Sequence, residues 1–421
     1  MPLPSIDDRQ TAPPPVPIPA GTRSSWSIRS PRSSAPLELR SLPRRERSRV
    51  RCSEVELLDA FVDRGIRDIV SVPCSVTDTW HALAAERAVR GELDLVMTAH
   101  EGNLAGIAAG IWFATGRPAL VHMQNSGLTN AADGFISLAS SDVYDIPFTA
   151  MVTFRGADDS ETSEPHQAIG RRTEALVDAV FGDDAVIAGS RDGRHLLNAA
   201  ELAAEAAIAG RRSVVKVAES GLERTVTPAS PEPVEFVAGA VSGSPATEPL
   251  QTTGRLTRDE AILAIAAQHP DAALLFCNGY TARAAQALVD GPRCFHNIGY
   301  MGGTLAIGWA LARSRPEIEV IVVDGDQNAL MSTMKDQVAA DRPTNLRWYV
   351  LDNGIGASVG TSESIPLGTR YDDLATVIRT LPDEPGSFQH PRVGTQDGSP
   401  LNTLARRFRG WIASHDQGEG R

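Results

Sequence analysis

Lysine is nearly absent from this chain, which has only Lys216 and Lys335, so almost all of its basic charge is arginine. The four cysteines form no Cys-x-x-Cys pair, which argues against a structural zinc site and a disulfide framework and fits a reducing cytosol. No run of about 18 apolar residues is present, so we expect no membrane span. A convincing G-x-G-x-x-G loop and a P-loop are also missing, which argues against a plain nucleotide-binding α/β protein.

The net charge of −12 is unevenly distributed along the 421 residues. Residues 1–51 hold ten arginines and only four acidic residues, so the remainder is strongly acidic. An acidic body argues against a nucleic-acid partner. The basic segment is rich in Pro and Ser and lacks periodicity, so we expect a disordered extension. Its Arg/Ser bias also resembles a transit peptide, but its acidic residues and proline clusters argue against one, and we expect a cytoplasmic protein.

From about Glu54 the sequence alternates between helical and strand patterns, which is typical of a parallel sheet with helices on both faces. Apolar residues at helical spacing predict a first helix over 53–65, which ends at Gly65. Strands are expected at 66–73, 93–99, 118–124, 147–154 and 212–218, and further helices near Trp80 and at 101–116, 175–182 and 196–210.

Between about 224 and 255 the periodicity stops in a stretch rich in Pro, Ser, Thr and Gly, which is typical of a linker. Beyond it we expect helices at 257–269, 281–290, 304–314 and 329–341, and strands at 273–278, 319–326 and 346–354. The predicted fold class is therefore α/β, with two doubly wound parallel-sheet domains at 52–224 and 255–421 joined by a linker at 225–254.

Two polar residues end successive apolar strands of the second domain. Asp326 ends one strand and Asn353 the next, with one helix between them, so both belong to one β-α-β unit. A right-handed crossover makes these strands parallel and places both residues at the edge where α/β sheets bind ligands. Carboxylate and amide oxygens suit Mg²⁺, and the helix near Ala329 offers N–H groups to an anion. An ordinary acidic loop is the alternative.

The Gly325-Asp326 pair followed by Asn353-Gly354 resembles the signature of thiamine diphosphate-dependent enzymes. The resemblance implies that Asp326, Asn353 and the carbonyl of Ile355 hold Mg²⁺ against the cofactor diphosphate. Family members usually have glycine where this chain has Gln327, and we expect Gln327 to turn its backbone N–H to the diphosphate. The resemblance further implies cofactor contacts by Gly325, Asn328 and Ser358.

Three other segments carry the same resemblance. Glu101 begins a helix after a strand, as does the family's catalytic glutamate beside the aminopyrimidine ring; a glutamate that merely favours the helix dipole is the alternative. FHNIGYMGG (295–303) resembles the family's GSMG segment, which implies that Gly299 and Met301 contact the cofactor; core packing is the alternative for Met301. FCNGYTAR (276–283) resembles a segment that touches the diphosphate, which implies contacts by Gly279, Tyr280 and Thr281.

The substrate side is expected in the first domain. The loop in VHMQNSGLTNA (121–131) resembles one that faces the reacting end of the cofactor, although Ser and Asn are also common turn formers. VPCS (72–75) resembles a VP-x-S turn, which implies that Cys74 lines the pocket and Ser75 binds the anionic head. Arg155 and His166 are also expected to contact the substrate; the alternatives are an arginine on a helix face and a solvated histidine. The expected substrate residues are Cys74, Ser75, Gln124, Asn125, Ser126, Arg155 and His166.

Over about 52–380, and most specifically over 100–156, the chain resembles the phosphonopyruvate decarboxylase family. That implies loss of CO₂ from 3-phosphonopyruvate to give phosphonoacetaldehyde, in the biosynthesis of phosphonate antibiotics and related natural products. Sulfopyruvate decarboxylase, which Cys74 favours, and a non-catalytic relative of the same fold are the alternatives. The family also implies a small anionic 2-keto acid substrate and at least a homodimer, with active sites at subunit interfaces and no nucleic-acid or membrane partner.

Overall fold

The computed structural model describes residues 51–157, 161–182, 185–190, 192–223, 255–355, 365–367, 371, 373–383, 388–394 and 400–417, all within one compact unit. We call residues 51–223 the first half and residues 255–417 the second half. The expected linker at 225–254 and, except for Arg51, the expected N-terminal extension lie outside the described residues.

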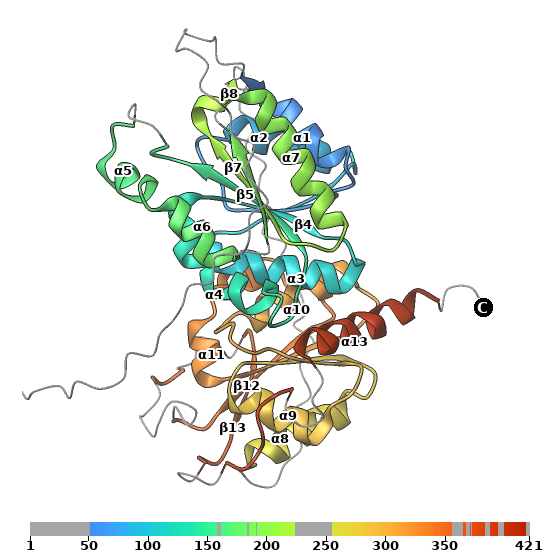
Figure 1. Ribbon diagram of the computed structural model, residues 1–421. Helices are drawn as coiled ribbons and strands as arrows, with labels where there is room; N and C mark the ends of the chain where they lie inside the picture. Colours follow the sequence, from blue (N-terminus) through green and yellow to red (C-terminus); the bar gives the residue numbers. More distant parts are fainter. Residues whose placement is uncertain are drawn as a thin grey trace, which may run out of the picture. The chain divides into compact units, whose positions relative to one another are not determined.

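The first half is built on a six-stranded parallel sheet in the order β3-β2-β4-β5-β7-β6 (Figure 1). Its strands are β2 (Asp68–Ser71), β3 (Asp94–Met97), β4 (Ala119–Gln124), β5 (Phe148–Phe154), β6 (Val186–Ser190) and β7 (Ser213–Ala218). Its helices are α1 (Glu54–Val62), α2 (Asp78–Val89), α3 (Leu104–Thr115), α4 (Leu128–Ala139), α5 (Glu164–Gly170), α6 (Thr173–Phe181) and α7 (Gly193–Ile208). The short strands β1 (Cys52–Ser53) and β8 (Leu222–Glu223) form a separate parallel pair.

Successive residues of each central strand point into different hydrophobic clusters. Ile69 and Leu120 pack in the cluster that contains α1, α2 and α7, whereas Val70 and Val121 pack in the cluster that contains α3 and α4. Because side chains alternate across a strand, a sheet covered on both faces needs apolar residues at every position. This is why the strands read as continuous apolar runs.

The second half has a five-stranded parallel sheet in the order β10-β9-β11-β12-β13. Its strands are β9 (Ala273–Phe276), β10 (Cys294–His296), β11 (Val320–Gly325), β12 (Leu346–Asp352) and β13 (Thr376–Arg379). Its helices are α8 (Arg258–Gln268), α9 (Tyr280–Val289), α10 (Thr304–Ser314), α11 (Asp326–Met331), α12 (Lys335–Ala340) and α13 (Leu401–Ser414). The prediction of an α/β fold with parallel sheets is confirmed.

One predicted helix, over 329–341, is wrong. The chain forms α11 and α12 instead, because Ser332 takes an extended backbone conformation with φ −64° and ψ 126°. The next residue, Thr333, donates its hydroxyl to Asn103 of the first half. This tertiary contact has no counterpart in the helical pattern. The sequence patterns did not indicate short elements such as α5, β6, β10 and β13, nor the longer helices α4 and α13.

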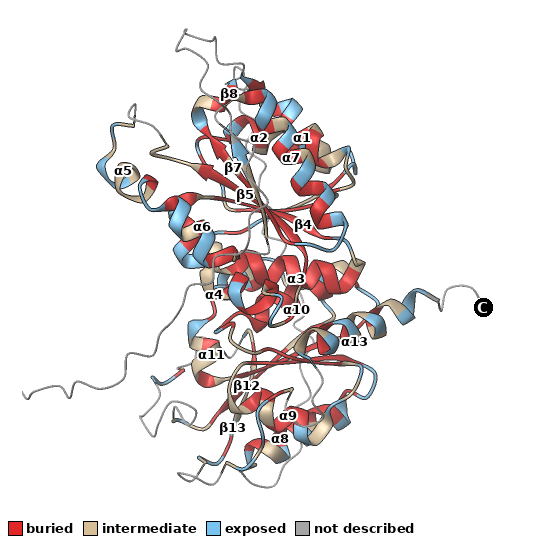
Figure 2. Ribbon diagram, viewed as in Figure 1, coloured by how far each residue is buried: buried red, intermediate tan, exposed pale blue. Residues whose placement is uncertain are grey.

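The two halves meet through α3 and α10, which lie side by side and are coloured as buried along most of their length (Figure 2). Small residues allow the close approach. A side chain at Gly110 of α3 would place its Cβ 2.4 Å from the carbonyl oxygen of Ile307 in α10. A helix that is apolar on every face needs such burial, and here it joins the cores of both sheets.

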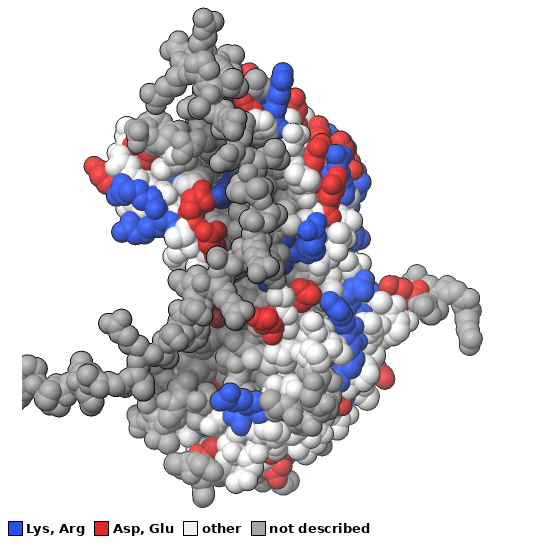
Figure 3. Space-filling view, viewed as in Figure 1, with Lys and Arg blue, Asp and Glu red and all other residues white. Residues whose placement is uncertain are grey.

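The outer surface carries charges of both signs. Figure 3 shows Asp and Glu side chains interspersed with Lys and Arg on the viewed face. None of the described helices is both long and apolar enough to cross a bilayer. The expected absence of nucleic-acid and membrane partners stays a prediction.

Candidate active site

A pocket lies at the carboxyl edge of the second sheet, where three of the recognised motifs meet. Asp326 follows β11 and Asn353 follows β12, two strands that pair in parallel. Gly279, between β9 and α9, has a φ of 97°, which residues with side chains rarely adopt. Residues predicted to bind cofactor or metal that line this pocket are Gly279, Tyr280, Thr281, Met301, Gly325, Asp326, Gln327, Asn328, Asn353 and Ile355.

The three proposed metal ligands offer only oxygen atoms, as Mg²⁺ prefers. The Asp326 side chain is nearly buried at 5% exposure, and the Asn353 Oδ1 atom accepts the N–H of Ile355 at 3.1 Å. That bond folds the chain so that Ile355 lines the pocket beside Asn353. Since the N-terminus of α9 opens on the same pocket, the residues present fit a divalent cation together with a diphosphate.

Gln327, which stands where the resemblance led us to expect glycine, lies in the first turn of α11. Among the described residues, Asp145 is the one non-glycine residue with positive φ, so the substitution causes no backbone strain at Gln327. The backbone N–H of Gln327 donates to Asp326 Oδ1 at 2.8 Å. The structure thus directs this N–H to the candidate metal ligand, and its contact with a diphosphate stays a prediction.

Two asparagines tie together the loops around the pocket. Asn328 Oδ1 accepts the N–H of Gly302 at 3.1 Å, and Asn328 Nδ2 donates to the carbonyl of Asn278 at 3.1 Å. Asn278 Oδ1 in turn accepts the N–H of Gly299 at 3.3 Å. Gly299 and Gly302 have φ values of 86° and 68°, so the loop between them depends on glycine at both ends.

Met301 lies between those glycines and is 53% exposed, which argues against plain core packing. It lines the pocket at Asp326 and also a second pocket between the halves, and Met331 is shared in the same way. The N–H of Met301 donates to Asp133 Oδ2 in α4 at 2.9 Å. Adjoining pockets that share two methionines suit an elongated ligand with an anionic end and a ring end.

Glu101 begins the short 3₁₀ helix η1 (Glu101–Asn103) just before α3. Its Oε2 atom accepts from Asn130 Nδ2 at 3.0 Å, and the His100 Nδ1 atom accepts the N–H of Gly102 at 3.0 Å. A Cβ at Gly127 would lie 2.4 Å from the Glu101 Cγ atom, so glycine there leaves room for the carboxyl group. His100, Gly102 and Asn130 line the second pocket with Met301.

The Glu101 turn and the Met301 loop therefore come together within one chain. The hydroxyl of Tyr300 donates to the carbonyl of Gly102 in the Glu101 turn, and the N–H of Met301 donates to Asp133 in α4 of the first half. The expected homodimer, with its active sites at subunit interfaces, stays a prediction.

The expected substrate loop is linked to the VPCS turn. Gln124 Nε2 donates to Ser126 Oγ at 2.7 Å, and Gln124 Oε1 accepts from the Cys74 thiol at 3.5 Å. Thr153 Oγ1 donates to the Cys74 sulfur at 3.2 Å, which holds the buried thiol in place. Ser75 is exposed beside it. Gln124, Ser126 and Ser75 stay candidates for substrate contact, and Ser358 lies outside the described residues.

Asn125 has a different environment from its neighbours because its side chain is fully buried. Its Nδ2 atom donates to the Arg155 carbonyl at 2.9 Å and to Thr173 Oγ1 at 2.7 Å, and its Oδ1 atom accepts the N–H of Arg155 at 3.3 Å. These bonds give Asn125 a structural role between β4 and β5, in place of the expected substrate contact.

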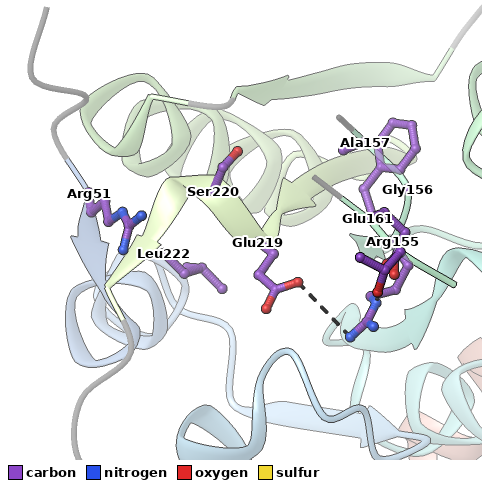
Figure 4. A pocket seen from close by; sticks show the side chains of 10 residues that line it. Arg51, Arg155, Gly156, Ala157, Glu161, Glu219, Ser220 and Leu222 are labelled. Carbon is purple, nitrogen blue, oxygen red and sulfur yellow. Dashed lines mark hydrogen bonds and ion pairs between the residues drawn. The ribbon is translucent and has the colours of Figure 1, made fainter. Parts of the chain in front are cut away.

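Arg155 lines another cavity, of about 350 Å³, that shares no lining residue with the pockets around Met301 (Figure 4), and His166 contacts Arg155. Arg155 Nε donates to Glu161 at 3.1 Å, its Nη1 atom lies 4.0 Å from Glu219, and its Nη2 atom lies 3.2 Å from His166. A hydrogen bond from the backbone of Ser163 and the nearby Arg155 lower the pKa of Glu161. Because these carboxylates offset the guanidinium, the arrangement does not favour a phosphonate dianion.

The sequence patterns did not indicate several residues of the site. Asn130 and Asp133 are one turn apart on α4, and both face the join between the halves. Arg258 lines the metal pocket and donates to Asp383 at 2.9 Å, and Asp383 accepts from Asn353. The one pattern in the sequence that points to Asn130 and Asp133 is their i, i+3 spacing in α4. Asp383 lies in a segment without a periodic pattern.

Comparison with known proteins defines the class. Residues 55–175 match the family model described as "Thiamine pyrophosphate enzyme, N-terminal TPP binding domain". The chain is 28% identical to a phosphonopyruvate decarboxylase of Streptomyces viridochromogenes, covering 86% of this chain and 96% of that protein. It is 27% identical to a sulfopyruvate decarboxylase of Methanosarcina acetivorans, covering 76% and 80% respectively. It is 36% identical to the sulfopyruvate decarboxylase subunit beta of Methanothermobacter thermautotrophicus, covering 30% and 72%.

The fold and these comparisons are thus those of a thiamine diphosphate-dependent enzyme. The chain belongs to the family of thiamine diphosphate-dependent decarboxylases that includes phosphonopyruvate and sulfopyruvate decarboxylases. It is accordingly a carboxy-lyase with thiamine diphosphate as its cofactor, and the alternative of a non-catalytic relative is set aside.

Proposed function

We propose that this decarboxylase converts 3-phosphonopyruvate to phosphonoacetaldehyde and CO₂. The observation that carries the choice of substrate is the similarity to a phosphonopyruvate decarboxylase over 96% of that protein's length. By the same proposal the enzyme acts in the cytoplasm in the biosynthesis of phosphonate natural products, antibiotics among them, as a homo-oligomer of at least two chains.

The residues of the second half would hold the cofactor. Asp326, Asn353 and the carbonyl of Ile355 would bind Mg²⁺, and the backbone at Gly279 and at the start of α9 would bind the diphosphate. Gly325, Gln327 and Asn328 line the same pocket, and Met301 separates it from the second pocket. When bound, thiamine diphosphate supplies a carbon nucleophile and an electron sink for the electrons released with CO₂.

The residues of the first half would do the proton chemistry. Glu101 would act through its carboxyl group, which Asn130 orients by the 3.0 Å hydrogen bond to Oε2. Gln124 and Ser126, already hydrogen-bonded to each other, present polar groups from the end of β4 for the keto acid. Burial between the two halves would keep water from the reacting atoms.

Sulfopyruvate is the second candidate substrate. A specific observation favours it: the 36% identity to a sulfopyruvate decarboxylase beta subunit. Cys74 in the VP-x-S turn also favours sulfopyruvate. The single-chain relative from Methanosarcina also means that having both halves in one chain does not distinguish the two substrates.

The deciding experiment measures aldehyde release from phosphonopyruvate, sulfopyruvate and pyruvate side by side with the purified full chain. We expect the highest kcat/KM for phosphonopyruvate. A higher value for sulfopyruvate would transfer the assignment to the sulfonate, and equal values for all three would defeat both.

A separate measurement tests the cofactor site. Thiamine diphosphate with Mg²⁺ should raise the melting temperature, because a ligand that binds only the folded state stabilises it by about 2.7 kcal/mol at a hundredfold excess over Kd. Asp326→Ala should abolish the magnesium-dependent part of this shift. An unchanged shift in that variant would remove Asp326 from the metal site.

A further inference from the structure

Tyr300 makes a contact that the proposed function does not use. It stands between Gly299 and Met301, and its side chain is almost fully buried at 4% exposure. Its hydroxyl donates a hydrogen bond to the carbonyl of Gly102, the residue that follows Glu101. One end of Tyr300 therefore belongs to the cofactor-facing loop of the second half, and the other end touches the turn of the candidate catalytic acid.

The ring of Tyr300 occupies a slot formed by three glycines from three segments. A Cβ at Gly106 in α3 would lie 2.9 Å from the ring, one at Gly134 in α4 would lie 3.0 Å from it, and one at Gly303 would lie 2.0 Å from it. Each distance is too short for two carbon atoms in contact. Any side chain at these positions would displace the ring, so the slot fixes where the hydroxyl points.

The same junction is held by polar contacts on either side of the slot. The N–H of Met301 donates to Asp133, and the Glu101 carboxylate accepts from Asn130 one turn earlier in α4. Tyr300 adds a bond to the backbone of the Glu101 turn itself. With all three in place, the Glu101 turn cannot shift relative to the Met301 loop without breaking a hydrogen bond.

We propose that Tyr300 is a positioning residue, which fixes the Glu101 turn against the Met301 loop through its hydrogen bond to Gly102. The inference rests on the proposed role of Glu101. Proton transfer depends steeply on the placement of the acid, and a displacement of about 1 Å lowers rates by as much as about 100-fold. Losing the hydroxyl of Tyr300 therefore loosens the acid without removing it.

Tyr144 provides a matched control. It is also buried, at 1% exposure, and its hydroxyl also donates to a backbone carbonyl of the other half, that of His296. The two tyrosines thus make the same kind of bond across the same join, but Tyr144 does not touch the Glu101 turn. Tyr300→Phe and Tyr144→Phe should lower the melting temperature by similar amounts, since each keeps its ring and loses one hydroxyl.

The test compares both variants and Glu101→Gln with the unaltered full chain by two measurements. The first is amide hydrogen exchange of the segment 100–104 in the cofactor-free protein, followed by mass spectrometry. The second is the rate at which the C2 proton of bound thiamine diphosphate exchanges with D₂O. For Tyr300→Phe we expect faster amide exchange and C2 exchange slower by about 10- to 100-fold. For Tyr144→Phe we expect no change in either, and for both we expect cofactor affinity within about threefold of the unaltered chain.

The outcomes separate this inference from the proposed function. Slow C2 exchange in Glu101→Gln with unaltered exchange in Tyr300→Phe would overturn the role of Tyr300 and leave Glu101 in place. Unaltered C2 exchange in Glu101→Gln would overturn the role of Glu101, and that of Tyr300 with it. Gly134→Ala gives an independent check, because its methyl group crowds the ring from α4 and should reproduce both effects of Tyr300→Phe.

Discussion

The carboxamide of Asn353 donates from Nδ2 to Asp383 Oδ2 at 3.1 Å. The same carboxylate accepts from Arg258, whose two NH groups bond to its two oxygens. With its amide nitrogen held by Asp383, Asn353 has one orientation, in which Oδ1 lies beside the Ile355 N–H. Asp383 therefore fixes which atom of a candidate metal ligand is offered to the metal.

Asp383→Ala should weaken Mg²⁺ binding. Without its partner the Asn353 amide is free to rotate, and residues that orient metal ligands typically contribute about 10- to 100-fold in metal affinity. The measurement is the Mg²⁺ concentration that gives half of the thiamine diphosphate-induced melting shift. Asp259→Ala is the control. Asp259 follows Arg258 in α8, bonds to His390 at 2.8 Å and does not line the pocket. Equal effects in the two variants would contradict the role of Asp383.

Glu101→Gln should retain cofactor binding and lose turnover by about 100- to 10,000-fold, the usual contribution of a general acid or base. Gln keeps the size of the side chain but not its ability to transfer a proton. The matched control is Glu164→Gln, which changes an exposed glutamate in the first turn of α5. Steady-state aldehyde release measures the loss of turnover, and a thermal shift with cofactor measures the retained binding. Turnover in Glu101→Gln equal to that of the control would remove Glu101 from catalysis.

Gly302→Ala should destabilise the fold by about 1–3 kcal/mol and weaken cofactor binding. Its φ is 68°, and an added Cβ would lie 2.7 Å from the backbone of Met331. Gly410→Ala in α13 is the control, because its Cβ would meet nothing within 4 Å. Alanine there should leave stability unchanged or raise it by up to about 1 kcal/mol, since glycine is unfavourable inside a helix. Urea unfolding compares the two, and the idea fails if Gly302→Ala is as stable as its control.

The fully buried His122 and the half-buried His81 beside it predict loss of stability in acid. His122 is fully buried, and Ser71, Thr77 and His81 surround its ring nitrogens at 2.9, 3.2 and 3.1 Å. Burial lowers the pKa of His122 well below 6.5, with repulsion from His81 as a second cause, and burial also lowers the pKa of His81. Both histidines are therefore neutral in the folded protein when the unfolded chain begins to bind protons.

The direction in which stability changes with pH follows from these depressed pKa values. The stabilising contribution is fully present above pH 6.5 and is lost as the pH falls below it, at up to about 1.4 kcal/mol per pH unit for one histidine. His122→Gln should therefore show a shallower decline in unfolding free energy between pH 7 and pH 5. His195→Gln, a change in an exposed side chain, should leave the slope as it is. Parallel slopes for the two variants would show that His122 does not contribute.

The sequence by itself determined the fold class and the positions of Glu101, Asp326 and Asn353. All three follow apolar strands, and parallel β-α-β units bring the carboxyl ends of their strands to one edge. The chain's local pattern is enough for such residues, because the covalent connection between strand and turn fixes where they lie. Their binding of cofactor and metal stays a prediction.

Only the tertiary structure decided what surrounds these positions. It buried Asn125 among bonds to Arg155 and Thr173, set Arg155 beside two carboxylates, and brought Asp383 to Asn353 and Tyr300 to Gly102. Most of these partners are far apart in the chain. Their contacts depend on how separate segments of the chain pack together, and a pairing created by packing leaves no periodic pattern in the sequence that local rules can detect.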